Sequence, residues 1–445
     1  MILRKSFLVR RRVDPWVLGV GAAMMPVRIG LGPIVLFVFA CIGIYLTCGR
    51  HRTTRLFARN FYICAVLYGI WSLGLIFVRG EPIMDNRQVG YTLLFTIFAF
   101  AGPGMVLMRD PLKAFVVGSR VGTVLAFLAT LTLVILYGGR IGVGGNPAVF
   151  AFVAGLAAIG ATIPIRGAPR YLPNGPWWLI LCSVVILASG TRAVLVVLPV
   201  FALVEMLIWL QRFTLKTRMI SYVAIVFAAY GIVSFNLVDR IGHSRFASII
   251  EYHETADAGK AESQASADAQ PSADAGKGGG EPPVAVPPVT ARLQSSAETR
   301  LVMWEGAKQV ILEHPLIGVG SYAKMDAVRA KAGENAPLLD GYRHVHNAVL
   351  DELLNGGVIG LVLLFACAYF ALSHLFRHSD CFAMTRAIIY FIIACTAYGM
   401  LHNPLLHEVT ISGIFFFLGA LNAAVSRSAM AERRGVSVNT AGAKG

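Results

Sequence analysis

The stretch that decides the fold is residues 345–375, VHNAVLDELLNGGVIGLVLLFACAYFALSHL. An apolar stretch of about 18 residues or more is long enough to cross the hydrocarbon core of a bilayer as a helix. This one begins with a titratable side chain, His346, directly after a long polar segment of the chain. The sequence therefore predicts a membrane helix that carries an imidazole at its aqueous end.

The composition of the whole chain is that of a membrane protein. Of the 445 residues, 56% are hydrophobic and 14% are charged, whereas soluble proteins average about 25% charged residues. Apolar runs of membrane-crossing length recur, and they lack the alternation of apolar and polar residues that a β-barrel strand requires. We predict an all-α polytopic membrane protein.

The apolar runs between polar breaks predict about twelve spans. They lie near residues 15–27, 29–48, 57–78, 89–108, 112–137, 146–164, 176–190, 192–210, 218–238, 345–375, 385–403 and 408–425. The first run follows a basic segment but continues into further spans, so we interpret it as a membrane helix and not as a cleaved signal peptide. None of the seven cysteines lies in the long polar segment, so no disulfide framework is indicated.

The basic residues predict the orientation in the membrane. The net charge of +15 is concentrated in alternate short connections between spans, which is typical of membrane topology and does not indicate nucleic-acid binding. With an even number of spans, both termini are cytoplasmic. The predicted organisation is nine spans within residues 1–238, an outer loop over 239–344, three spans within 345–425 and a cytoplasmic tail over 426–445.

The outer loop has two parts of different composition. Residues 255–291 are rich in Ala, Asp, Gly, Ser and Pro. Such a segment buries too little apolar surface to offset its ordering entropy, so we predict that it is disordered. From Glu298 the pattern becomes helical, and we predict an amphipathic helix over 299–313 on the membrane face. Its apolar positions recur at helical spacing and are Leu301, Trp304, Ala307 and Ile311.

His346 is the first candidate for chemistry, because histidine has an unperturbed pKa of about 6.5 and can accept a proton at neutral pH. Helical spacing places His346, Gly357 and Gly360 on one stripe, where glycines would let a neighbouring helix approach closely. The structural alternative is a helix-start histidine above packing glycines. The functional interpretation is favoured by the polar neighbours, which are Arg343, His344, Asn347, Asp351 and Glu352. Whether the two carboxylates support the histidine stays open.

Three outer arginines are candidates for binding an anion. Arg192 closes a tight Ser-Gly-Thr-Arg turn against the positive-inside bias, and Arg300 begins the predicted amphipathic helix. A guanidinium binds phosphate through two parallel hydrogen bonds, so these residues and Arg343 suit a pyrophosphate-bearing lipid. The alternatives are a snorkelling Arg192 and an ion pair between Arg300 and Glu298. Weaker candidates for the same site are Arg292, His344, Asn347, His402 and His407.

Two familiar kinds of site are absent from the sequence. There is no Walker-type glycine-rich loop and no HExxH motif, and the outer loop has no Asp-x-Asp of the kind with which glycosyltransferases hold a metal. We therefore expect a reaction that does not use a nucleotide and draws its free energy from an activated lipid-linked donor.

Three local strings give the chain its resemblance to the O-antigen ligase family, within a broader group that includes O-antigen polymerases and bacterial O-oligosaccharyltransferases. They are Ser189-Gly190-Thr191-Arg192, then Thr299-Arg300-x3-Trp304 running on to Glu313-His314-Pro315-Leu316-x-Gly318-x-Gly320, and His346-Asn347-x9-Gly357-x2-Gly360. The third is the most specific, because its spacing fits the family's histidine motif without a gap. The segment 255–291 departs from the family's pattern.

The resemblance implies a C-type (GT-C) glycosyltransferase fold and an inverting, metal-independent reaction at the periplasmic face of a Gram-negative inner membrane. O-antigen polysaccharide would pass from undecaprenyl pyrophosphate, the donor, to a sugar hydroxyl of lipid A–core, the acceptor. Membrane lipids would surround the protein. By position in the motifs, His346 would be the general base, and Arg192 and Arg300 would hold the departing pyrophosphate.

Three other functions remain possible at this point. An O-antigen polymerase uses the same donor, and a protein O-oligosaccharyltransferase transfers to serine or threonine. A transporter is disfavoured, because the sequence has no internal repeat and its candidate ionisable groups gather at one membrane surface.

Overall fold

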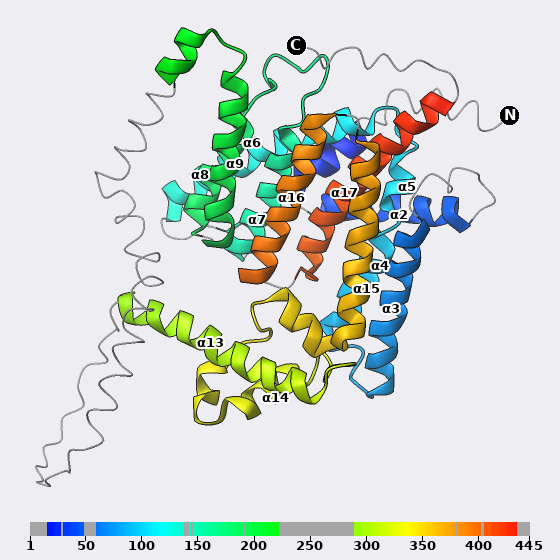
Figure 1. The fold of residues 1–445 in the computed structure, drawn as a ribbon, viewed down its shortest axis with the longest axis vertical. Helices are drawn as coiled ribbons and strands as arrows, with labels where there is room; N and C mark the ends of the chain where they lie inside the picture. The colour runs from blue at the N-terminus through cyan, green and yellow to red at the C-terminus, as the bar shows by residue number, and fades with distance from the viewer. Residues whose placement is uncertain are drawn as a thin grey trace, which may run out of the picture.

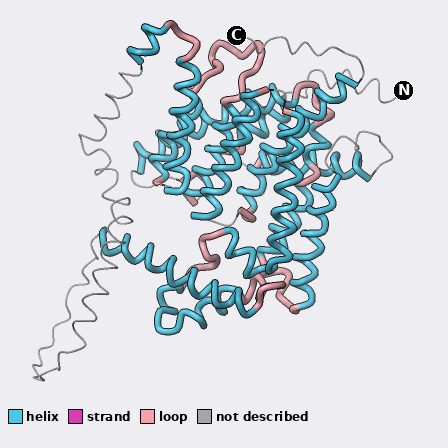
Figure 2. Tube along the Cα trace, in the orientation of Figure 1, coloured by secondary structure: helices cyan, strands magenta, loops and turns pink. Residues whose placement is uncertain are grey.

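The computed structural model describes residues 16–27, 30–48, 59–137, 142–143, 146–190, 192–221, 289–379, 381–401 and 405–433. Every regular element within these ranges is a helix (Figure 2). The all-α prediction is therefore confirmed for this part of the chain.

The helices follow one another as a bundle with an added unit at one end (Figure 1). Their bounds are α2 Leu31–Cys48, α3 Arg59–Val78, α4 Arg87–Phe98, α5 Ala101–Met105, α6 Pro111–Tyr137, α7 Pro147–Ala161, α8 Trp177–Ser189, α9 Arg192–Leu210, α13 Val289–Glu313, α14 Lys324–Ala332, the 3-10 helix η3 Gly333–Leu339, α15 Ala348–His378, α16 Phe382–Leu401 and α17 Glu408–Arg433.

Five of the described helices are long and apolar enough to cross a membrane: α3, α6, α15, α16 and α17. The helices α2, α7, α8 and α9 contribute shorter apolar segments. With 13 residues, α8 extends over about 20 Å at about 1.5 Å per residue, which is less than the roughly 30 Å of a hydrocarbon core. The structure therefore supports a polytopic membrane protein through five long helices, where we predicted about twelve spans. Most of the predicted span 218–238 lies outside the described residues.

The run 89–108, predicted as one span, is divided between α4 and α5. The short α5 crosses α2 at backbone contact: a Cβ on Gly104 would overlap the carbonyl of Phe39, and a Cβ on Gly43 would overlap that of Phe100. Only glycine permits so close an approach. A continuous helix would direct these glycines differently, and the apolar composition of the run gave no sign of the crossing.

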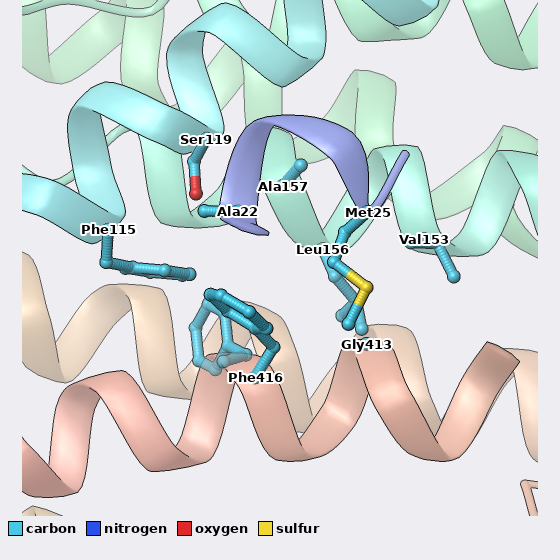
Figure 3. Close-up of a pocket in the computed structure, with 10 residues that line it drawn as sticks. Ala22, Met25, Phe115, Ser119, Val153, Leu156, Ala157, Gly413 and Phe416 are labelled. Atoms are coloured by element: carbon cyan, nitrogen blue, oxygen red, sulfur yellow. The ribbon is translucent and has the colours of Figure 1, made fainter. Parts of the chain in front are cut away.

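The interior of the bundle is closely packed. Every residue of α7 from Ala148 to Ala161 is buried. A small cavity of about 20 Å³ lies between residues 22–25, α6, α7 and α17, and its walls are apolar apart from Ser119 (Figure 3). That volume is only slightly more than one water molecule requires. This cavity is a packing defect and is too small for a substrate.

The helices α13 and α14 lie across one end of the bundle (Figure 1). They share a buried apolar cluster with η3 and the start of α15, formed by Met303, Ala307, Val310, Met325, Val328, Leu339, Val345 and Leu354. Of the stripe predicted for α13, Ala307 is buried but Leu301 is 46% exposed, because α14 packs on the adjacent face. The helix α13 begins at Val289, so residues 289–291 of the segment predicted to be disordered are helical.

Candidate active site

The second and third sequence strings meet at a break in α15. Gly357 has φ 66° and ψ −165°, which interrupts the helix. The loop that follows α13 enters this break. Val358 N–H donates to the carbonyl of Pro315 at 2.9 Å, and Val319 N–H donates to the carbonyl of Leu354 at 2.8 Å. The backbone groups released by the break are thus paired with the loop, as buried backbone groups require.

Two glycines make this junction possible. Gly318 and Gly357 have φ values of 68° and 66°, in the left-handed region that favours glycine. A Cβ on Gly357 would overlap the carbonyl of Leu316, and a Cβ on Gly318 would overlap carbonyls of α15. We predicted that both glycines of the histidine string admit a neighbouring helix. A Cβ on Gly360 would meet the Glu352 side chain of the same helix first and Trp71 of α3 next, so α3 does approach there. The prediction is wrong for Gly357, where the loop enters.

Arg79, directly after α3, holds both sides of the junction. Its guanidinium donates to the carbonyls of Asn355 at 3.1 Å, Ile317 at 2.6 Å and Gly318 at 2.9 Å. Hydrogen bonds from a charged donor are stronger than neutral ones. The loop and the broken helix are therefore fixed to α3 as well as to each other.

The start of α15 is fixed by Asn347. Its side-chain oxygen accepts hydrogen bonds from the backbone N–H groups of Val349 at 3.0 Å and Leu350 at 3.1 Å, and its amide nitrogen donates to the carbonyl of Met400 at 3.4 Å. This is an N-cap, which satisfies helix N–H groups that lack partners within the helix. The side chain of Asn347, which we predicted as a substrate-binding candidate, thus caps α15.

His346 has an unusual backbone conformation. Its φ is 52°, and among the described residues it is the one non-glycine with a positive φ. Such a conformation costs about 1–3 kcal/mol, and residues that adopt it cluster at functional sites. The preceding carbonyl, that of Val345, accepts a hydrogen bond from the Trp304 indole of α13 at 2.8 Å. The backbone on both sides of the histidine is thus held by hydrogen bonds.

A polar cavity of about 560 Å³ opens beside His346. This volume lies within the range of about 300–1,000 Å³ that is typical of ligand pockets. Its walls come from residues 85–91, Asn146, residues 321–329 and 341–346, the start of α15, and residues 406–407. The structure therefore brings four predicted site residues to one cavity: Arg343, His344, His346 and His407. No group of three or more His, Cys, Asp or Glu side chains suited to a metal occurs in the described ranges.

Two of the four cations that line the cavity are paired with carboxylates. Lys324 Nζ lies 2.8 Å from a carboxylate oxygen of Asp351, with both side chains buried. Arg329 lies 2.7 Å from Asp326. The remaining two, Arg87 and Arg343, are exposed.

Three rings gather in residues 342–346, before α15. The His346 ring centroid lies 4.5 Å from that of His344 and 5.5 Å from that of Tyr342, and both pairs are edge-on. Burial, reinforced by the positive charge that His346 can carry, lowers the pKa of His344 to about 4. His344 is therefore a neutral imidazole at physiological pH.

Comparison with protein families places this geometry in context. Residues 177–365 match the family described as O-antigen ligase. These residues therefore form a segment of the O-antigen ligase family. The curated proteins give no match to the chain. The matched segment includes the junction at Gly357 and His346, whereas Arg87 and His407 of the cavity lie outside it.

The other predicted residues lie apart from the cavity or outside the described structure. Arg300 is half-buried on α13, where burial lowers its pKa and its guanidinium donates to the carbonyl of Leu401 at 3.2 Å. Arg192 is the first residue of α9 and Arg292 lies in α13, but their side chains are outside the described part, as is the whole of His402.

Sequence reasoning missed Arg87, Lys324 and Arg329 as cavity residues. Arg87 opens α4 far from the histidine in sequence, and Lys324 meets Asp351 across 27 residues. No local spacing links such residues. A charged residue inside the first turn of an apolar helix, such as Asp351, was the available signal that a partner existed.

Proposed function

We propose that this protein is an O-antigen ligase that transfers O-antigen polysaccharide from undecaprenyl pyrophosphate to lipid A–core at the periplasmic face of the Gram-negative inner membrane. The observation that carries the proposal is His346. It lines a cation-bearing cavity at the end of an apolar helix, within the segment that matches the family.

The chemistry requires a base on the acceptor side. The acceptor hydroxyl attacks the anomeric carbon of the donor sugar and its proton passes to the His346 imidazole. The bond between the anomeric carbon and the pyrophosphate oxygen breaks, and its electron pair leaves with the pyrophosphate. Attack opposite the leaving group inverts the anomeric centre. A positioned general base typically accelerates such a step about 10²–10⁴-fold.

The leaving group requires fixed cations. Arg192 and Arg300 hold the pyrophosphate in this proposal, as the resemblance implies. Arg300 is half-buried, and a guanidinium in a poorly hydrated setting stabilises developing negative charge more strongly than one in water. The proposal also includes the GT-C architecture with about twelve spans, an outer loop over 239–344 and both termini in the cytoplasm.

The test is ligation by purified protein, with lipid-linked O-antigen and lipid A–core supplied, chelator present and nucleotide omitted. We expect the wild type to ligate and His346→Ala to lose about 10²–10⁴-fold in kcat. His314→Ala is the matched control, since His314 is an exposed histidine of the same loop region and does not line the cavity. Equal activity of wild type and His346→Ala would overturn the assignment of the base.

Acceptor choice separates the ligase from its rivals. In the same assay, transfer to a second lipid-linked chain in place of lipid A–core would identify a polymerase. Transfer to a serine- or threonine-containing peptide would identify a protein O-oligosaccharyltransferase.

A further inference from the structure

The cavity beside His346 holds two guanidiniums that pair with no carboxylate. Neither Arg87 nor Arg343 forms an ion pair within 4.0 Å in the described part of the chain. Once the two carboxylates paired with Lys324 and Arg329 are set aside, the lining contains one carboxylate, Asp85. The lining thus presents two exposed guanidiniums against a single carboxylate.

Both guanidiniums line the same cavity, together with Tyr91. Burial and the Glu408 carboxylate raise the pKa of Tyr91, and the charges of Arg87 and Arg343 act to lower it. Glu408 is not among the described residues that line the cavity. Two arginine forks in the lining of one cavity can bind a planar or tetrahedral oxyanion.

In the proposed function the pyrophosphate is held by Arg192 and Arg300, which belong to α9 and α13. None of the side chains that the structure describes in these two helices lines the cavity. The base must lie beside the acceptor hydroxyl, and His346 lines this cavity. Resting on the proposed function, this places the acceptor in the cavity.

We propose that the cavity binds the acceptor saccharide and that Arg87 and Arg343 recognise an anionic substituent on it, a phosphate or a carboxylate. This assigns Arg343 to the acceptor, where the sequence had suggested the pyrophosphate. Tyr91, Tyr322 and Tyr342 also line the cavity, and their aromatic rings offer apolar surface to sugar rings, as pockets with a few placed polar groups commonly do. Arg343 lies inside the segment that matches the family and Arg87 lies outside it, so this recognition joins two separate parts of the chain.

The experiment measures the preference of the full-length protein, purified in detergent, for an anionic saccharide. The probes are a lipid-free core oligosaccharide with its phosphates, the same oligosaccharide after enzymatic dephosphorylation, and an oligosaccharide carrying a uronic acid. The measured quantity is the ratio of Kd values between the anionic probe and the dephosphorylated one, for wild type, Arg87→Gln, Arg343→Gln and the control Lys308→Gln. Lys308 is an exposed cation of α13 outside the cavity.

Hydrogen bonds to a charged group are strong enough to change Kd by tenfold or more, and a tenfold change corresponds to about 1.4 kcal/mol. We therefore expect wild type to prefer the phosphorylated probe by tenfold or more, each arginine variant to lose about tenfold of that preference, and Lys308→Gln to retain it. A matching preference for the uronic acid would identify a carboxylate as the natural group, and a preference for phosphate alone would identify a phosphate.

Two results would overturn the inference: no preference in the wild type, or equal weakening of all probes by Arg87→Gln and Arg343→Gln. The ligation assay with lipid A–core separates this from the proposed function. If the protein ligates but shows no preference for an anionic saccharide, the acceptor subsite is refuted and the ligase function stands. If the wild type prefers the anionic probe, the arginine variants lose that preference, and no acceptor is ligated, the saccharide site stands and the ligase function is refuted.

Discussion

Replacing Lys324, which breaks its ion pair with Asp351, should lower the free energy of unfolding more than replacing any other lysine of the described structure. Lys324 Nζ lies 2.9 and 2.8 Å from the two carboxylate oxygens of Asp351, and the two side chains are 8% and 5% exposed. Asp351 also accepts from the side-chain amide of Asn355 at 3.3 Å. The pair joins α14 to the first turn of α15, directly beside the histidine segment.

The magnitude follows from what each variant leaves behind. Lys324→Met leaves a buried, unpaired carboxylate, and Asp351→Leu leaves a buried, unpaired ammonium. Either should lower the free energy of unfolding by about 3–5 kcal/mol, a large part of the roughly 5–15 kcal/mol that stabilises a typical domain. The double variant removes both charges, so it should recover most of the loss, since apolar replacement of a buried pair is often neutral or better.

The assay is heat or denaturant unfolding of the purified protein in one detergent for wild type, both single variants and the double variant. Lys308→Met is the control, because its 3.7 Å pair with Glu305 is exposed, with the two side chains 65% and 60% accessible. We expect that exposed pair to contribute at most about 0.5 kcal/mol. Single variants as stable as the control, or a double variant no more stable than the single ones, would refute the reasoning.

Two further outcomes follow from the same region. Gly357→Ala should lower the free energy of unfolding by more than Gly333→Ala when the two variants are unfolded side by side. Both glycines have a positive φ, which costs a residue with a side chain about 1–2 kcal/mol, but a Cβ would meet the Leu316 carbonyl at Gly357 and open space at Gly333. Equal losses of stability in the two variants would contradict the close approach at the junction. Burial holds the pKa of His344 at about 4, below the roughly 6.5 of an unfolded histidine. The unfolded chain therefore binds more protons between these values, and the free energy of unfolding should fall by up to about 3 kcal/mol as the pH drops from about 6.5 to 4. His344→Gln should flatten that decline, and parallel pH curves for variant and wild type would show that His344 is not its source.

The lengths of the apolar runs predicted the long helices well where packing between helices did not divide them. The long apolar runs became α3, α6, α15, α16 and α17, because length and composition decide whether a helix can be apolar throughout. The same reasoning failed for residues 89–108, because a close crossing at Gly104 depends on a partner that the run itself does not contain.

The stripe on α13 shows a second limit of sequence reasoning. Spacings of three and four residues admit more than one face, and Ala307 belongs both to the predicted stripe and to the buried face with Met303 and Val310. Which face is buried was decided by α14, whose packing contacts come from residues about twenty positions away. The candidate site has the same character. His344 and His346 were visible as local polar residues, whereas Arg87 reaches the cavity only through the fold.

The second and third strings that resemble the family are explained by the contacts between α13, the loop after it and α15. The helix α13 holds the carbonyl of Val345 through Trp304, and the loop that leaves the same helix docks at Gly357. One polypeptide segment therefore contacts the chain directly before His346 and again at the glycine break of α15. The number of residues between His346 and Gly357 is therefore set by the distance between these two contacts along the backbone, and not by a contact with substrate. A general base must lie within hydrogen-bond distance of the acceptor hydroxyl, and small errors in its position lower the reaction rate strongly. The contacts on both sides of His346 hold the base in a fixed position.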